Sequence, residues 1–157
     1  MLFFFSVGLI FIFSDEVRVG GKKNISNCHY KFKNIAHGNY KTVKGNETTT
    51  LLEMAEDAGK STGVITTTRV THATPGACYA HTADRDWESD KDIVDRKKEA
   101  SAANFPDIAR QLIEFPHGDG LAVALGGGRA KFIPKGMADP QTVVQKGEHL
   151  AGLDVSV

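Results

Sequence analysis

The chain has 157 residues, of which 41% are hydrophobic and 24% are charged. These values are ordinary for a globular domain and exclude a wholly disordered chain, and the length is enough for one domain with its own core. Lysine plus arginine and aspartate plus glutamate both number 19, which excludes a strongly basic nucleic-acid-binding protein.

The chain begins with an apolar run from Leu2 to Phe13 that only Ser6 and Gly8 interrupt. The run is too short to cross a bilayer core, which needs about 20 residues. Three interpretations remain open: a secretory signal peptide, a buried strand, or sequence that is not part of the native protein. A signal peptide predicts a secreted or extracytoplasmic protein, with membrane association as a further alternative.

A mixed, basic segment follows from Val17 to Asn39 and has the composition of a linker. We therefore interpret residues 1–40 as a hydrophobic leader and a basic linker. The cysteines Cys28 and Cys78 permit one disulfide but define no framework, and two unpaired thiols are the alternative. Two glycosylation sequons, Asn24-Ile25-Ser26 and Asn46-Glu47-Thr48, matter only if the chain enters a eukaryotic secretory route.

The next segment predicts a helix followed by a strand. Asn46 is expected to cap the helix and Gly59 to end it, with leucine and alanine side chains inward at helical spacing. The acidic side chains are expected on the solvated side: Glu47, Glu53, Glu56 and Asp57. The strand runs from Gly63 to Val70 and is rich in β-branched residues.

This strand breaks at Pro75-Gly76, where polar and ionisable residues gather. A strand that ends in such a loop is where α/β proteins place their sites. The residues concerned are His72, Thr74, His81, Asp84, Arg85 and Asp86.

In the remaining sequence, a predicted helix is again followed by a predicted strand. Residues 88–104 are charged and predict an exposed excursion. Pro106 is expected to begin a second helix, which Pro116 ends. Leu121–Leu125 predicts a short buried strand that is closed by Gly126-Gly127-Gly128. We read the glycines and Arg129 as a tight turn without a binding role. Helices alternating with apolar strands predict an α/β fold, with a mostly parallel sheet flanked by helices.

Three short motifs carry a resemblance to a known family. They are His72-Ala73-Thr74-Pro75, Ala80-His81-Thr82 and Asp84-Arg85-Asp86-Trp87, followed later by Leu125–Arg129. Together they resemble the metal- and phosphate-binding segment of alkaline phosphatases, over residues 41–139. The resemblance implies that residues 41–157 are an incomplete alkaline-phosphatase-like domain, and that residues 1–40 have no counterpart.

The resemblance assigns roles to three residues. It implies that Thr74 is a magnesium ligand, that His72 lies beside this metal and holds metal-bound water, and that Arg85 binds the substrate phosphate. A guanidinium suits the last role because its planar fork matches two phosphate oxygens. The alternatives are a Thr74 hydroxyl bonded to the turn backbone, a partly buried His72, and an Arg85 paired with Asp84 or Asp86. We assign His81 a structural role.

Other parts of the family pattern are missing. Hydrolysis in this family uses a serine nucleophile within an Asp-Ser-Ala type sequence, two zinc ions and a magnesium ion. No such sequence occurs between Met1 and Lys60, and neither His117 nor His149 has the context of a zinc ligand. In vertebrate-type members two cysteines form a bridge, but the aligned positions here hold Tyr40 and Phe105.

The resemblance therefore implies metal-dependent phosphomonoester hydrolysis by a homodimeric parent enzyme. We identify no catalytic residue in this chain, and we expect it to be an inactive fragment without zinc ligands. Two alternatives remain: a secreted phosphate- or metal-binding module without catalysis, and a structural or interaction domain.

Overall fold

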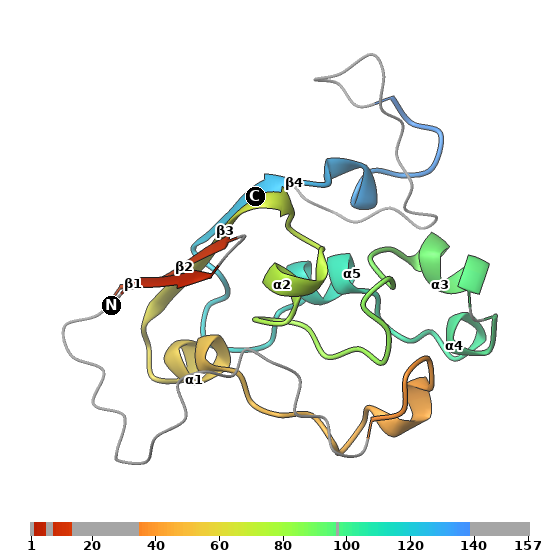
Figure 1. Cartoon of the computed structure of the whole chain (residues 1–157), viewed down its shortest axis with the longest axis horizontal. Helices are drawn as coiled ribbons and strands as arrows, with labels where there is room; N and C mark the ends of the chain where they lie inside the picture. Colours follow the sequence, from red (N-terminus) through yellow and green to blue (C-terminus); the bar gives the residue numbers. More distant parts are fainter. Residues whose placement is uncertain (1, 6–7, 14–34, 97, 139–157) are drawn as a thin grey trace.

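The structure is a computed structural model that describes residues 2–5, 8–13, 35–96 and 98–138. Figure 1 shows the strands at the left of the view, α1 below them and α2 to α5 toward the right. The strands are β1 (Leu2–Phe5), β2 (Gly8–Phe13), β3 (Ser61–Arg69) and β4 (Val123–Gly127). The helices are η1 (Tyr40–Thr42), α1 (Leu51–Asp57), α2 (Ala73–Gly76), α3 (Asp90–Arg96), α4 (Lys98–Ala102), α5 (Ile108–Ile113) and η2 (Arg129–Lys131).

The described strands form one sheet in the order β1-β2-β3-β4. β3 and β4 are parallel, and α2 to α5 make the crossover that parallel strands require. The expected α/β fold with a parallel pair and flanking helices is thus confirmed. β2 pairs with β3, and β1 with β2, in antiparallel fashion, so the apolar N-terminal run adds two strands to one edge.

The β3–β4 pair depends on a close backbone approach at Gly63. Gly63 lies opposite Val123, and a Cβ atom added to this glycine would lie 2.9 Å from the Val123 carbonyl oxygen. Real Cβ atoms essentially never come so near, so an alanine here would push the two strands apart. A glycine in this position therefore permits the parallel pairing.

Helix α1 begins later than the sequence suggested. Thr50 is the N-cap: its Oγ1 accepts a hydrogen bond from the Glu53 N–H, and the Glu53 carboxylate accepts one from the Thr50 N–H at 2.6 Å. This reciprocal pair is a capping box. The expected cap, Asn46, instead donates its amide Nδ2 to the Thr42 carbonyl at 3.0 Å, and the prediction of that cap was wrong.

The prediction that Glu53 and Glu56 face solvent was also wrong. Glu53 is only 3% exposed and Glu56 only 2%. Each buried carboxylate has a partner from elsewhere in the chain, because Glu53 contacts His81 and Glu56 accepts a hydrogen bond from the Thr62 hydroxyl. A buried charge is tolerated only with such partners.

Two main apolar clusters hold the described fold together. One joins α1, β3 and α5 through Leu52, Val64, Cys78, Tyr79, Ala80 and Ile108. The other surrounds Trp87, which is fully buried, with Val43, Ala83, Ile93 and Ala100. Phe105 packs edge-on against Trp87, with ring centroids 5.5 Å apart, and Tyr40 lies 6.0 Å from Phe105.

The second cluster overturns the expectation that residues 88–104 form an exposed excursion. They include α3 and α4, and Glu88, Ser89, Ile93 and Ala100 are buried. Few large apolar residues occur there, but Ile93 and Ala100 are buried in one cluster with the large side chain of Trp87.

The second predicted helix is confirmed as α5, although it begins at Ile108, with Asp107 as its N-cap, rather than at Pro106. The predicted burial of Leu121–Leu125 was wrong: β4 is exposed along its length, with Leu125 at 57%. β4 lies at the edge of the described sheet, and its one neighbouring strand there is β3. In the part of the chain that the structure describes, every helix is too short or too polar to cross a membrane.

Candidate functional site

The candidate site begins where β3 ends. The chain turns there into the single-turn helix α2, with His72 as its N-cap residue and Thr74 inside it. The Tyr79 hydroxyl donates a hydrogen bond of 2.7 Å to the Val70 carbonyl, which fixes the end of the strand against the residues that follow α2. His72 and Thr74 are therefore held on one turn next to the sheet.

Their side chains differ in surroundings. Thr74 is exposed, and its hydroxyl makes no hydrogen bond within the described ranges. The His72 ring is partly buried, and its Nδ1 atom is buried without a hydrogen-bond partner among those same residues. A buried ring nitrogen without a partner is uncommon and costly, so this atom is available to a ligand or an ordered water.

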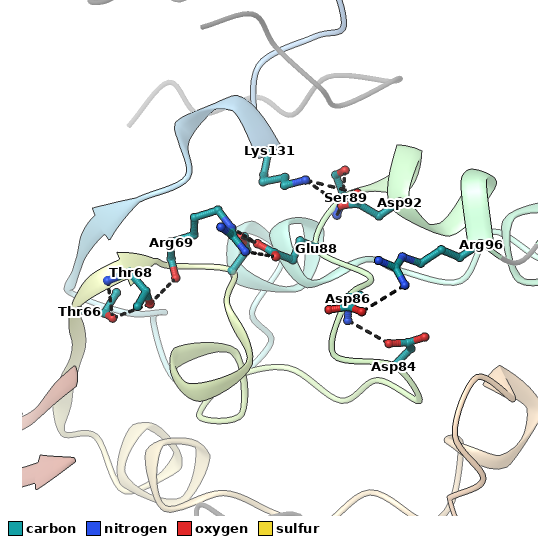
Figure 2. Close-up of polar contacts among 11 residues, drawn as sticks. Thr66, Thr68, Arg69, Asp84, Asp86, Glu88, Ser89, Asp92, Arg96 and Lys131 are labelled. Carbon is teal, nitrogen blue, oxygen red and sulfur yellow. Dashed lines mark hydrogen bonds and ion pairs between the residues drawn. The ribbon is translucent and has the colours of Figure 1, made fainter. Parts of the chain in front are cut away.

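Arg85 lies on the loop that follows Thr82 and is exposed. Its acidic neighbours contact other residues. Asp86 pairs with Arg96 at 3.1 Å, and the Asp84 Oδ1 atom accepts a hydrogen bond from the Asp86 N–H at 3.0 Å (Figure 2). The same Asp84 oxygen lies 3.7 Å from the His37 ring. Within the described ranges the Arg85 guanidinium has no ion pair or hydrogen bond. Its charge is accordingly open to an anion from solution.

A partly buried ion pair connects this loop to β3. Glu88, 6% exposed, accepts two hydrogen bonds from Arg69, Nε to Oε2 and Nη2 to Oε1, both at 2.7 Å (Figure 2). The Thr71 hydroxyl donates a third at 2.6 Å. Arg69 and Thr71 directly precede His72, and Glu88 comes just after Arg85, so the pair joins the two halves of the candidate site.

The charge state of Glu88 follows from these contacts. Burial alone raises the pKa of this carboxyl, but the hydrogen bonds from Arg69 and Thr71 and the charges of Arg69 and Lys131 outweigh burial and hold the pKa below its usual value. Glu88 is therefore ionised at neutral pH. No local pattern in the sequence marks Glu88, because its partners lie 17 and 19 positions away.

A second contact connects α3, which follows the Arg85 loop, to the segment after β4. Gly128, in a left-handed conformation with φ of 92°, ends the strand and begins η2. Lys131 then reaches Asp92 at 3.1 Å, and Asp92 also accepts hydrogen bonds from the Ser89 hydroxyl and N–H (Figure 2). Gly126 and Gly127, which were expected in a tight turn, instead extend β4, and Gly128 alone turns the chain into η2, which directs Lys131 toward α3.

A cleft of about 440 Å³ lies on another part of the surface, beside the N-terminus of α1. Two imidazoles meet a buried carboxylate there: His81 Nε2 lies 2.7 Å and His117 Nε2 3.7 Å from Glu53 Oε1. His117 also contacts Asp57 at 3.0 Å. The structural role expected for His81 fits this contact, and its partner could not be seen in the sequence.

The pKa of Glu53 responds to the same contacts. Burial raises it, but the hydrogen bonds from His81 and the Thr50 N–H, together with the nearby imidazoles of His81 and His117, lower it overall. Glu53 therefore carries its charge at neutral pH, and these partners offset the cost of burying it.

The described residues do not form a complete metal centre. No three histidine, cysteine, aspartate or glutamate side chains within the described ranges are grouped so that they could hold a metal ion. Thr74 offers a neutral oxygen and His72 a buried ring nitrogen, but Mg²⁺ also needs carboxylates that neutralise its charge. Thr74 and His72 could supply part of such a site and not the whole of it.

The sequence can now be compared with known proteins. The alkaline phosphatase profile matches residues 25–156, so residues 25–40, expected to lie outside the resemblance, fall within it. The chain is 46% identical over 118 residues to the tissue-nonspecific alkaline phosphatase of Gallus gallus, covering 73% of this chain and 22% of that protein. It is 52% identical over 99 residues to an alkaline phosphatase of Gadus morhua, covering 62% of this chain and 20% of that protein. It is 44% identical over 98 residues to alkaline phosphatase 4 of Drosophila melanogaster, covering 62% of this chain and 16% of that protein.

The chain thus spans about a fifth of the length of these relatives. The matched stretch includes β3, α2, the Arg85 loop and β4, which are the elements described above. The chain belongs to the alkaline phosphatase family.

Proposed function

We propose that the parent enzyme of this chain hydrolyses phosphomonoesters with the help of metal ions, that the chain alone is an inactive fragment, and that Arg85 binds the phosphate group. Family membership supports the phosphatase class. The observation that carries the role of Arg85 is the state of its guanidinium, which is exposed while Asp84 and Asp86 contact other residues. A planar cation without a carboxylate partner is suited to bind two phosphate oxygens.

The proposal extends to the metals. Thr74 is the expected magnesium ligand and His72 its neighbour, while zinc ligands and carboxylates for magnesium lie outside the residues identified here. When bound, these ions would activate a nucleophile and stabilise the leaving oxygen. The chain's own contribution is to position Arg85, because the residues that directly follow it are tied to β3 by the Glu88–Arg69 pair and to α3 by the Asp86–Arg96 pair.

The first experiment measures hydrolysis of an aryl phosphate by the 157-residue chain at high pH with Zn²⁺ and Mg²⁺ added. We expect little or no turnover, because the described residues contain no complete metal centre. Robust turnover that is lost on chelation would show that the chain holds a complete catalytic site and that our assignment of an incomplete one is wrong.

The second experiment isolates Arg85. We expect inorganic phosphate to shift the NMR signals of the Arg85 loop with a dissociation constant in the millimolar range, about −4 kcal/mol, since one exposed cation binds weakly. Arg85→Ala should abolish the shift and Arg85→Lys should weaken it, because lysine lacks the planar fork. Arg110→Ala removes an equal charge elsewhere and should change nothing. Micromolar affinity without turnover would instead favour a non-catalytic phosphate-binding module.

Location and assembly are parts of the same proposal. We propose a secreted or extracytoplasmic homodimer acting on a phosphomonoester. Fractionation of expressing cells tests the location, and light scattering of the purified protein tests the assembly. Recovery of the protein solely from the cytosol, or as a monomer at all concentrations, would contradict the respective part.

A further inference from the structure

The sequon Asn46-Glu47-Thr48 occupies a surface segment between η1 and α1. Asn46 is partly buried, while Glu47 and Thr48 are exposed, and the backbone there forms neither helix nor strand. An Asn-x-Thr sequence accepts an oligosaccharide only where the chain is accessible and can adopt the shape that the transferase requires. Glu47 and Thr48 are accessible here, and the segment is not held in a helix, because α1 does not begin until Leu51.

The contacts of Asn46 leave room for a modified side chain. Its amide nitrogen carries two hydrogens and donates one of them to the Thr42 carbonyl at 3.0 Å. Transfer of an oligosaccharide replaces one amide hydrogen by the anomeric carbon of the first sugar and leaves the other. The bond to Thr42, and the backbone bond of 2.9 Å from the Asn46 N–H to the Val43 carbonyl, can therefore both persist.

The two residues that the transferase must recognise are also clear of the nearby cleft. The cleft is lined from this segment by Glu47 and Thr49, whereas Asn46 and Thr48 do not line it. The Thr48 hydroxyl makes no hydrogen bond within the described ranges, so it is available to the transferase. By contrast, Thr50 is committed to the cap of α1 and to the Cys78 carbonyl at 2.7 Å.

We propose that Asn46 is an N-glycosylation site of this protein. The donor is an oligosaccharide linked to a polyprenyl pyrophosphate: a bond forms between Asn46 Nδ2 and the anomeric carbon, the lipid pyrophosphate leaves, and the amide loses one proton. The glycan would stand at the rim of the α1 cleft and shield the turn before that helix. The inference is independent of phosphatase activity, although it shares with the proposed function the entry of the chain into a secretory route.

The test is translation of the full chain, fused behind a cleavable secretory leader, in the presence of eukaryotic microsomes. Only protease-protected product is analysed, so every molecule examined has met the transferase. We expect a fraction of slower mobility that peptide N-glycosidase removes and that carries an aspartate at position 46 afterwards. Asn46→Gln and Thr48→Ala should both abolish it.

Matched variants separate this site from its surroundings. Asn24→Gln removes the other sequon, and Thr49→Ala changes the neighbouring threonine; both should leave the modified fraction as in the unaltered chain. Thr48→Ala keeps the hydrogen bond from Asn46 to Thr42 and so controls for misfolding in Asn46→Gln. An unmodified Asn46 in the protected wild-type product, or a glycan on Asn46 that survives Thr48→Ala, would overturn the proposal.

Discussion

Replacing Glu88 by glutamine is the most informative perturbation of the fold, because it changes one atom at the joint between β3 and the Arg85 loop. The glutamate accepts two hydrogen bonds from Arg69 and one from Thr71. Glutamine fits the same space but keeps one acceptor oxygen, and its amide hydrogens face donors. At least one Arg69 bond is lost, together with the ionic attraction.

The size of the effect follows from burial. Hydrogen bonds to charged groups contribute about 1.5–3 kcal/mol, and loss of a partner inside a protein adds a desolvation penalty. The Glu88 side chain is 8% exposed, but that of Arg69 is 47% exposed, so water can solvate the arginine left behind. We therefore expect Glu88→Gln to lower the free energy of unfolding by about 2 kcal/mol, or Tm by about 6 °C.

The assay is chemical denaturation at pH 7, with Glu114→Gln as the matched control. Glu114 pairs with Arg110 at 2.9 Å on the surface, and exposed pairs of this kind contribute about 0.3–0.5 kcal/mol. If Glu88→Gln costs no more than Glu114→Gln, the pair does not hold the loop and the reasoning fails.

The pH dependence gives a second check. Because the pKa of Glu88 is lowered in the folded protein, its contribution is present above the ordinary value of 4.5 and is lost as the pH falls through the folded value. The difference between wild type and Glu88→Gln should accordingly vanish in acid.

Three further predictions follow from the geometry. Thr50→Ala removes the capping box of α1 and the bond to the Cys78 carbonyl, and should lower stability by about 1–2 kcal/mol in thermal unfolding, whereas Thr49→Ala should not. Gly63→Ala should separate β3 from β4, seen as faster amide exchange in both strands; unchanged exchange would refute the close approach to Val123. Arg85→Ala should leave the unfolding free energy within about 0.5 kcal/mol of wild type, as expected for an exposed residue without partners; a larger loss would point to a structural role.

The elements with a strong local signal could be predicted from the sequence. The β-branched run from Gly63 to Val70 became β3, and the apolar spacing after Pro106 became α5, because these patterns depend on neighbouring residues. The strand formed by residues 123–127 was also predicted, but not its exposure, since burial of a strand depends on what lies beside it in space.

Two of the errors share one cause, which is a partner far away in the chain. Glu53 looked like a solvated residue of an amphipathic helix, yet His81 is 28 positions distant and lies against it. The segment after Trp87 looked exposed because its charges outnumber its apolar residues, but Ile93 and Ala100 pack on that tryptophan. Spacing along a helix does not show such contacts.

For the candidate site, the resemblance identified Thr74, His72 and Arg85, and their roles remain predictions. What the sequence did not show is how the loop carrying Arg85 is held. Arg69 and Glu88 belong to different elements, and a pair of opposite charges separated by 19 positions has no recognisable spacing. Only the geometry shows that the end of β3 and the Arg85 loop form one connected unit.

Tyr40 and Phe105 stand at the two positions that the resemblance aligns with bridged cysteines, and their rings meet in a tilted contact with an interplanar angle of 60°. Relatives of the vertebrate type are expected to close this junction with a sulfur bridge, whose presence depends on the reduction potential of the medium. Aromatic packing has no such dependence, so the junction between η1 and the loop before α5 should be equally intact in reducing and oxidising buffers. The chain can therefore acquire this part of its architecture before it meets an oxidant.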